Sequence, residues 1–125
     1  MALPAYILVV EDDPGLRAAM TEALEDCGYE VACAGDGKDA LAQLEASPAP
    51  SVILLDLAMP VMDGWSFRAA QRRDPRFAAI PTVVLSASIG ADACVLDGLD
   101  PAAALAKPFD LERLIATVQR LCVAA

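Results

Sequence analysis

Apolar residues in this chain follow two patterns, short continuous runs and stripes at helical spacing. Runs rich in branched residues, typical of strands buried on both faces of a parallel sheet, cover Tyr6–Val10, Val52–Leu55 and Thr82–Leu85. The stretch Tyr29–Ala34 alternates in the manner of a more peripheral strand, and Ala102–Ala106 is a further short apolar run. The pattern therefore predicts five strands.

Five helices are predicted between and after these strands. The clearest stripes are Leu16, Met20 and Leu24 after Pro14, and Leu111 to Cys122 after a capping Asp110. Shorter helices are predicted over Lys38–Ala46, from Asp63-Gly64 to Asp74-Pro75 with Trp65, Ala69 and Arg72 at helical spacing, and weakly over about Ile89–Leu96. Alternating strands and helices predict a doubly wound α/β fold. Right-handed crossovers then place the carboxyl ends of all strands at one edge of the sheet.

Length and composition indicate one globular domain with a core over about residues 6–122. The chain has 125 residues, 57% of them hydrophobic and 22% charged. Its apolar runs are too short to cross a membrane and its N-terminus lacks a signal peptide, so we expect a cytoplasmic location without membrane contact. A net charge of −9 argues against direct nucleic-acid binding. The basic cluster of Arg72, Arg73 and Arg76 is interpreted as a solvated helix face.

The cysteines carry no predicted chemistry. Four cysteines lack C-x-x-C spacing and the chain contains no histidine, which argues against a zinc site. We expect them to be small core residues.

Polar residues that can do chemistry stand directly after the predicted strands. The first strand is followed by Glu11-Asp12-Asp13, the third ends in Asp56, the fourth in Ser86, and the last precedes Lys107. Pro60 and Gly64 require the chain to leave the sheet in a loop soon after Asp56. Alone, Asp56 also fits a loop aspartate that caps the next turn. Ligands of open α/β sheets bind at the carboxyl ends of the strands, so the four strand ends together favour a reactive site.

Acidic groups in this arrangement suit phosphoryl chemistry. A carboxylate can attack phosphorus and form an acyl phosphate. Glu11, Asp12 and Asp56 together offer the oxygen ligands that Mg²⁺ prefers. Without a cation, three clustered acids would repel one another and raise one another's pKa values.

From Ile7 to Leu121 the sequence resembles the receiver domains of two-component response regulators. The matching segments, in the family's order, are Val9-Val-Glu-Asp-Asp13, Leu55-Asp56 with Met59-Pro60 and Asp63-Gly64, Ser86-Ala87, and Lys107-Pro108-Phe109. The resemblance implies a single receiver domain with a flavodoxin-like sheet of strand order 2-1-3-4-5. It also implies a cis peptide between Lys107 and Pro108.

Site roles follow from the resemblance residue by residue. Glu11 and Asp12 match the metal-binding acidic pair, and Asp56 matches the phosphorylated residue and third metal ligand. The Ala58 backbone carbonyl would complete the protein ligands of Mg²⁺. Ser86 matches the switch hydroxyl, and Lys107 matches the lysine that pairs with a phosphoryl oxygen. Asp13 is interpreted as the N-cap of the helix that starts at Pro14.

The chain departs from the family pattern at Ala104, where receivers usually carry an aromatic switch residue. Phosphorylation would then be reported by loop and helix shifts after Ser86, and an aromatic-coupled dimerisation switch is not expected. Ala58 and Ser88 match the positions that tune the lifetime of the phosphorylated state.

The resemblance implies a Mg²⁺-dependent phosphoacceptor whose donor is a phosphohistidine on a sensor histidine kinase or a histidine phosphotransferase. The first and last helices are the expected docking surface. Output would pass to a downstream protein target or to a fused effector domain. Such a domain is a signalling module, with at most self-catalysed phosphotransfer and slow autodephosphorylation as enzyme-like activity.

Three alternative functions fit the sequence less well than a phosphoacceptor receiver. A phosphorylation-independent pseudo-receiver, acting as a protein-binding module, is favoured only by Ala104 and the weak fourth helix. A phosphatase of the haloacid dehalogenase type would need a second aspartate where Ala58 stands. A flavodoxin-like electron carrier would need a phosphate-binding loop where the chain has Glu11 to Asp13.

Overall fold

A computed structural model describes residues 6–86 and 98–123 of the chain. Its centre is a five-stranded parallel sheet of order β2-β1-β3-β4-β5, which confirms the predicted topology. The strands are β1 (Tyr6–Val10), β2 (Glu30–Ala34), β3 (Val52–Asp56), β4 (Thr82–Ser86) and β5 (Ala103–Ala106). Each lies within one residue of its predicted bounds.

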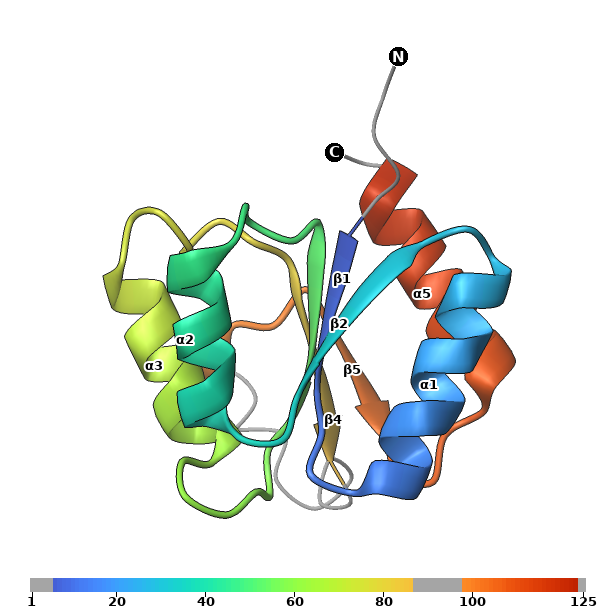
Figure 1. The fold of residues 1–125 in the computed structure, drawn as a ribbon, viewed down its shortest axis with the longest axis horizontal. Helices are drawn as coiled ribbons and strands as arrows, with labels where there is room; N and C mark the ends of the chain where they lie inside the picture. Colours follow the sequence, from blue (N-terminus) through green and yellow to red (C-terminus); the bar gives the residue numbers. More distant parts are fainter. Residues whose placement is uncertain (1–5, 87–97, 124–125) are drawn as a thin grey trace.

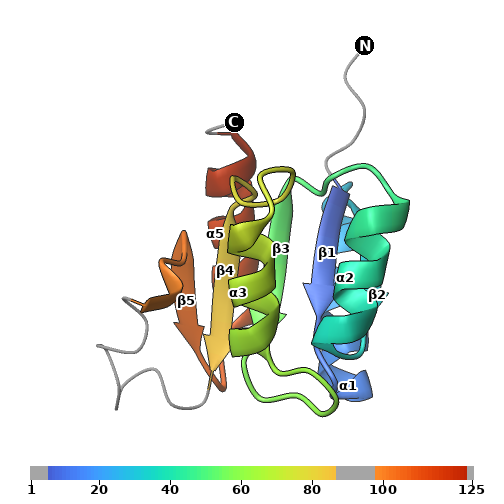
Figure 2. The ribbon, with the colours of Figure 1, turned by 90° about the vertical axis from the view of Figure 1, so that its left-hand side faces the viewer.

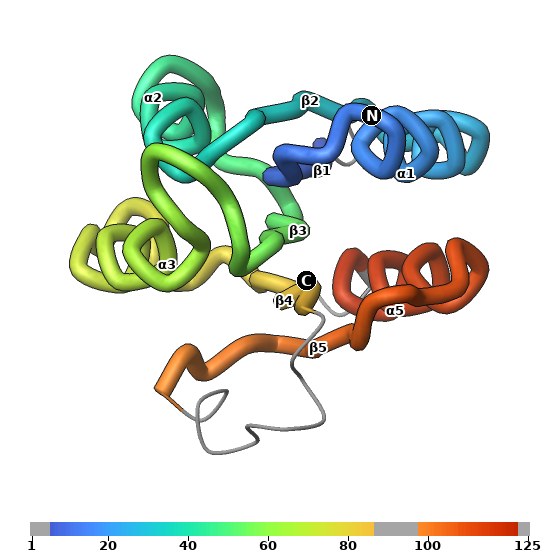
Figure 3. Tube along the Cα trace, turned by 90° about the horizontal axis from the view of Figure 1, so that it is seen from below, coloured from blue at the N-terminus to red at the C-terminus, as the bar shows by residue number. Residues whose placement is uncertain are grey.

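Helices cover both faces of this sheet. Those described are α1 (Pro14–Asp26), α2 (Gly37–Ala46), α3 (Gly64–Arg73) and α5 (Leu111–Val123). The α1 and α5 helices pack on one face and α2 and α3 on the other, as Figure 1 and the end-on view of Figure 3 show. The helix predicted over about residues 89–96 lies outside the described residues, so the count of five stays a prediction. None of the helices in the described ranges has the length and apolar composition of a membrane span.

Two hydrophobic layers result from the alternation of side chains along the strands. Ile7, Val9, Val52 and Leu54 point to α1 and α5, while their neighbours Leu8, Val10, Ile53 and Leu55 point to α2 and α3. Both faces of β1 and β3 are therefore buried, which explains why these strands are continuous apolar runs.

Aspartates start all four described helices: Asp13, Asp63 and Asp110 were predicted, and Asp36, which accepts the N–H of Asp39, starts α2. The Asp13 carboxylate accepts the N–H groups of Gly15 and Leu16, and that of Asp63 accepts the N–H of Ser66. Asp110 accepts the N–H of Glu112 in the first turn of α5. Because each cap directly follows a strand or its loop, it fixes where the helix starts relative to the strand end.

The α3 helix buries a different side from the one its apolar residues suggest. Trp65, Ala69 and Arg72 lie on its exposed side, and the buried side carries Phe67, Arg68 and Gln71. Phe67 packs in the layer under α2 and α3. The long polar side chains can be buried because tertiary partners satisfy them.

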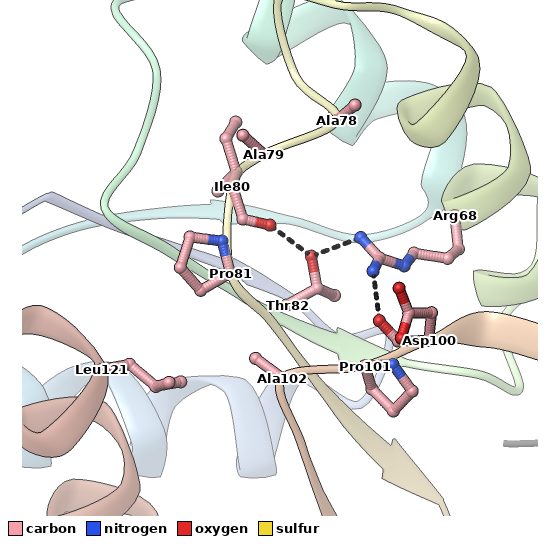
Figure 4. Close-up of a pocket in the computed structure, with 10 residues that line it drawn as sticks. All are labelled: Arg68, Ala78, Ala79, Ile80, Pro81, Thr82, Asp100, Pro101, Ala102 and Leu121. Atoms are coloured by element: carbon pink, nitrogen blue, oxygen red, sulfur yellow. Dashed lines mark hydrogen bonds between the residues drawn. The ribbon is translucent and has the colours of Figure 1, made fainter. Parts of the chain in front are cut away.

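Arg68 is the centre of this polar cluster (Figure 4). Its guanidinium donates to the Gln71 side-chain oxygen at 2.9 Å and to the Thr82 hydroxyl at 3.0 Å. It also donates to the carbonyl oxygens of Leu99 at 2.9 Å and Asp100 at 2.7 Å. Arg68 thus joins α3 to the start of β4 and to the segment that leads into β5.

Two smaller expectations need correction. Cys27 follows the last residue of α1 and is exposed, whereas Cys33 and Cys122 are half-buried, so the cysteines are not all core residues; Cys94 lies outside the described residues. Arg76 lies beyond the end of α3, and its guanidinium pairs with Glu45 and Asp74 at 2.6 and 2.7 Å. Only Arg72 and Arg73 of that cluster lie on the helix.

Candidate functional site

The four predicted strand ends meet at one edge of the sheet. The register pairs Val10 with Leu55, Asp56 with Leu85, and Ser86 with Ala106. Asp56 and Ser86 are the last residues of their strands, and Glu11 and Lys107 come directly after β1 and β5, so the four residues lie at the same end of the sheet. Figure 2 shows the arrowheads of β1, β4 and β5 pointing to this edge. Parallel pairing therefore brings together residues that are up to 96 positions apart in the sequence.

Three carboxylates converge at this edge. One oxygen each from Glu11, Asp12 and Asp56 lies within 4.8 Å of the others. Glu11 is fully buried and Asp56 is 3% exposed, whereas Asp12 faces solvent. The cluster thus has two desolvated acids at its base and one accessible acid at its rim.

Lys107 is the cation that faces these acids. Its Nζ donates to Glu11 Oε1 at 2.7 Å and lies 3.2 Å from Asp56 Oδ1. The peptide bond that follows it, Lys107–Pro108, is cis, as the resemblance implied. One ammonium group faces three carboxylates, so the cluster keeps two negative charges when all its members are ionised.

The pKa values of Glu11 and Lys107 are both shifted by burial and by their charged neighbours. Burial raises the pKa of the Glu11 carboxyl to about 7; the hydrogen bond from Lys107 lowers it, and the neighbouring Asp56 raises it. Burial lowers the pKa of Lys107, but its contacts with Glu11 and Asp56 outweigh that effect and hold the pKa above its ordinary value. Near neutral pH, Glu11 therefore exchanges a proton easily while Lys107 stays charged.

Backbone and helix groups hold the acids in place. The N–H of Asp13 donates to Glu11 Oε2 at 3.3 Å, and the N–H of Ala58 donates to Asp56 Oδ1 at 3.3 Å. Arg17 of α1 donates to the Glu11 carbonyl at 2.8 Å. Sequence reasoning missed Arg17, because its contact with Glu11 depends on how α1 folds back over the end of β1.

Two glycines, Gly64 at the start of α3 and Gly37 at the start of α2, make close contacts with the loop from β3 to α3 or with its ends. A side chain at Gly64 would collide with the Asp56 carbonyl oxygen and the Leu57 Cα. A side chain at Gly37 would meet Met62, whose carbonyl accepts the Gly37 N–H at 2.9 Å. These close contacts seat the loop against β3 and α2. In the same loop, Val61 is 79% exposed and has a φ angle of 66°, an uncommon conformation for a β-branched residue.

A cleft of about 670 Å³ opens beside the acids. It is lined by Asp12, Leu57, Ala58, Met59, Pro60, Asp63, Trp65 and Ser86. Asp12 and Ser86 therefore face one space, as the strand ends predicted. Met59, Pro60 and Trp65 also border it, a role that the sequence alone did not reveal.

Ala104 occupies the position where receivers usually carry a ring. It packs beside Leu57, Val84 and Leu99 on the α3 side of β4 and β5 and is half-buried. Ser88 lies outside the described residues. Within the described residues, the small cluster around Ala104 contains only aliphatic side chains.

The donor set suits a hard divalent cation. Carboxylate oxygens are the protein ligands that Mg²⁺ prefers, and a dication would neutralise the two excess negative charges. Asp12 and the cleft beside it leave the site open to solvent on one side, which suits a metal that keeps several of its waters.

Comparisons with known proteins agree with this geometry. The family model described as response regulator receiver domain matches residues 7–119. The "DNA-binding dual master transcriptional regulator RpaA" of a Synechocystis strain is 38% identical over 117 residues, which are 92% of this chain and 48% of that protein. The chain also spans 53% of the "Response regulator Rre1" of the same organism, so it covers about half the length of these curated relatives.

Solved structures give the same result. The chemotaxis response regulator CheY4 of Vibrio cholerae matches with a TM-score of 0.86 and 32% identity, over 95% of this chain and 99% of that one. The receiver domain of the sensor histidine kinase PA1611 of Pseudomonas aeruginosa, solved with a magnesium ion in its active-site cleft, matches with a TM-score of 0.86 and 29% identity, over 97% and 99%. With its sheet order, its strand-end acids and these matches, the chain belongs to the receiver domain family of response regulators.

Proposed function

We propose that this chain is a Mg²⁺-dependent phosphoacceptor that takes a phosphoryl group from a phosphohistidine onto Asp56. The observation that carries the proposal is the convergence of Glu11, Asp12 and Asp56 around one half-buried lysine, Lys107, at the edge of the sheet. A purely structural cluster of this kind would be costly, because like charges that are desolvated repel one another.

The residues of the chain have distinct roles in the transfer. An Asp56 carboxylate oxygen attacks phosphorus, a P–O bond forms, and the P–N bond to the donor imidazole breaks with its electron pair leaving on nitrogen. Glu11, Asp12, Asp56 and the Ala58 backbone carbonyl would hold Mg²⁺. The bound cation would neutralise charge between the attacking carboxylate and the incoming phosphoryl group.

Lys107 and Ser86 act on the product. Lys107 already lies 3.2 Å from Asp56 Oδ1, close enough for its ammonium group to turn to a phosphoryl oxygen. The Ser86 side chain borders the same cleft and can donate a hydrogen bond to a second oxygen. Because these contacts arise only after phosphorylation, they give the modified state the differential free energy that a switch requires.

With Ala104 in place of an aromatic residue, phosphorylation of Asp56 would have to change the surface of the domain without the movement of a ring. The aliphatic cluster of Leu57, Val84, Leu99 and Ala104 contains no ring that can move inward. We therefore assign the response to the backbone that follows Ser86 and to the helices beside it.

The family is one of signalling domains, so the donor is a histidine kinase or a histidine phosphotransferase, with α1 and α5 as the docking surface. The output would be a protein target or a fused effector domain, without direct nucleic-acid contact by this domain. Slow autodephosphorylation and a cytoplasmic location stay predictions. The phosphorylation-independent module is the less favoured alternative, because it gives no reason for the buried acids.

Intact-mass measurement after incubation with acetyl phosphate tests this proposal. The wild-type chain should gain one phosphoryl group only when Mg²⁺ is present, and Asp56→Asn should gain none. Asp13→Asn is the matched control, since asparagine still caps α1 and the substituted carboxylate is exposed beside the site. A folded wild-type chain that neither binds Mg²⁺ nor gains mass would leave the phosphorylation-independent module as the better account.

A further inference from the structure

A second groove runs along the exposed side of α3 and adjoins the cleft of the proposed phosphoacceptor site at Trp65, which lines both. Its volume is about 490 Å³. From α3 it is lined by Trp65, Arg68, Ala69, Arg72 and Arg73, which follow one another at helical spacing. Gly98 and Leu99 form the opposite wall. Trp65, Ala69 and Arg72 are the stripe that the sequence marked, and they lie on the exposed side of the helix.

The groove concentrates positive charge on an acidic molecule. The chain has nine lysines and arginines against eighteen acids, yet three of the arginines line this groove and, among the residues that the structure describes, no carboxylate does. Arg76, just beyond the helix, is paired with Glu45 and Asp74. Over the described residues, by contrast, no ion pair joins Arg72 or Arg73 to an acid; Arg72 donates only to the Gly98 carbonyl, at 2.8 Å.

The positive charges of Arg68 and Arg72 repel each other. Burial lowers the pKa of the Arg68 guanidinium and the nearby charge of Arg72 lowers it further, whereas Asp100 raises it. The described lining of the groove therefore carries a net positive charge, and an anion placed there would interact favourably with the exposed guanidinium groups of Arg72 and Arg73.

Trp65 adds an apolar contact to this charge. It is the only tryptophan of the chain, it is 38% exposed, and it lies one helical turn before Ala69 on the wall of the groove. An exposed aromatic ring beside arginines is the composition of a protein-binding hot spot. The net charge of −9 opposes a nucleic acid as the occupant, because a polyanion would be repelled by the rest of the surface.

We propose that the α3 groove docks an acidic segment of a partner protein, with an apolar side chain against Trp65 and Ala69 and carboxylates on Arg72 and Arg73. The segment would be guided to this face because the remainder of the molecule repels it. The interaction does not involve Asp56, so it stands independently of the phosphoacceptor proposal.

The test is binding of two synthetic peptides to the folded chain. One carries glutamates on both sides of a central pair of leucines, and the other replaces every glutamate with glutamine. Neither contains tryptophan, so the fluorescence of Trp65 reports contact with the groove or with the cleft that Trp65 also borders, and the arginine variants below separate the two. Anisotropy of a labelled peptide gives the affinity. The acidic peptide should bind more tightly, shift the Trp65 emission, and dissociate as salt is added.

Two double variants distinguish binding in the α3 groove from non-specific electrostatic attraction between the acidic peptide and any arginine on the surface. Arg72→Gln/Arg73→Gln should weaken binding of the acidic peptide about tenfold. Arg113→Gln/Arg120→Gln removes the same charge from exposed positions on α5 and should leave the affinity within about twofold. Asp56→Asn should bind as the wild type does, which keeps this result separate from the phosphorylation experiment.

Three outcomes would overturn the proposal. The first is equal affinity for the two peptides, and the second is an unchanged affinity in Arg72→Gln/Arg73→Gln. The third is a different occupant: self-association in sedimentation that the α3 double variant abolishes would identify a second copy of this chain, and tighter binding of a single-stranded oligonucleotide than of the acidic peptide would identify a nucleic acid.

Discussion

Two clusters of buried charge lie at opposite edges of the same sheet. At the amino-terminal ends of the strands, Arg68 places its guanidinium among neutral oxygens of Gln71, Thr82 and two backbone carbonyls. At the carboxyl ends, Lys107 faces the carboxylates of Glu11 and Asp56 with Asp12 nearby. The first cluster is satisfied by the fold itself, and the second retains negative charge that the fold does not compensate.

The difference separates a structural cluster from the proposed phosphoacceptor site. Buried polar atoms in the described residues all have hydrogen-bond partners, so both clusters are well bonded. What distinguishes them is net charge: a single cation is stabilised by donating hydrogen bonds to neutral oxygens, whereas clustered like charges need an external ion. The predictions below test this contrast, from the largest expected effect to the smallest.

Removing the structural cation should cost the most stability. Arg68→Met leaves the Thr82 hydroxyl and two carbonyl oxygens without their donor, and we expect it to lower the free energy of unfolding by about 3 kcal/mol. Urea denaturation measures the loss. Arg113→Met, at an exposed position on α5, should change stability by less than about 0.5 kcal/mol. Equal effects would show that Arg68 is not a structural centre.

Mg²⁺ affinity should depend on pH through Glu11. The folded-state pKa of this carboxyl is raised from 4.5 to about 7, so between these values the folded chain holds a proton that the unfolded chain has lost. Its contribution to stability therefore falls as pH rises through that window. Because Mg²⁺ must displace the same proton, its affinity should rise with pH, by up to about tenfold per unit, and level off above about pH 7.

Titration calorimetry at several pH values checks this dependence. Asp12→Asn should weaken Mg²⁺ binding but keep the slope with pH, since Asp12 is exposed. Glu11→Gln should weaken binding and remove the slope. A slope that persists in Glu11→Gln would assign the proton to another group.

Removing a functional acid should stabilise the metal-free chain. In Asp56→Asn, Lys107 keeps its 2.7 Å contact with Glu11 while one of the crowded carboxylates is neutralised. We expect a gain of about 1 kcal/mol without Mg²⁺. Addition of Mg²⁺ should stabilise the wild type and reverse the order of the two proteins. A loss of stability in metal-free Asp56→Asn would show that its carboxylate is compensated by the fold.

The smallest effect should come from the surface ion pairs. Arg76 makes contacts of 2.6 and 2.7 Å with Glu45 and Asp74, yet its side chain is 58% exposed. Arg76→Gln should leave the urea midpoint unchanged within error at physiological salt, because water and ions screen exposed pairs. A clear shift would mean that short distance, rather than burial, governs the energy of charge pairs in this protein.

The sequence by itself determined the alternation of strands and helices and the identity of the strand-end residues, and the family resemblance supplied the strand order. Continuous apolar runs such as Val52–Leu55 are typical of interior strands, and right-handed crossovers place the carboxyl ends of parallel strands at one edge, which predicts that Asp56, Glu11 and Lys107 meet. The helix caps at Asp13 and Asp63 could also be predicted from the sequence, because each carboxylate accepts hydrogen bonds from backbone N–H groups only two or three residues away.

The tertiary structure alone decided which polar side chains are buried. Arg68 faces inward because carbonyls from residues more than thirty positions away satisfy it, and Glu11 has a raised pKa because the fold buries it beside Asp56. The exposed stripe of Trp65, Arg72 and Arg73 has the same origin. Helical spacing defines a face, but long-range packing decides whether that face meets the core or the solvent.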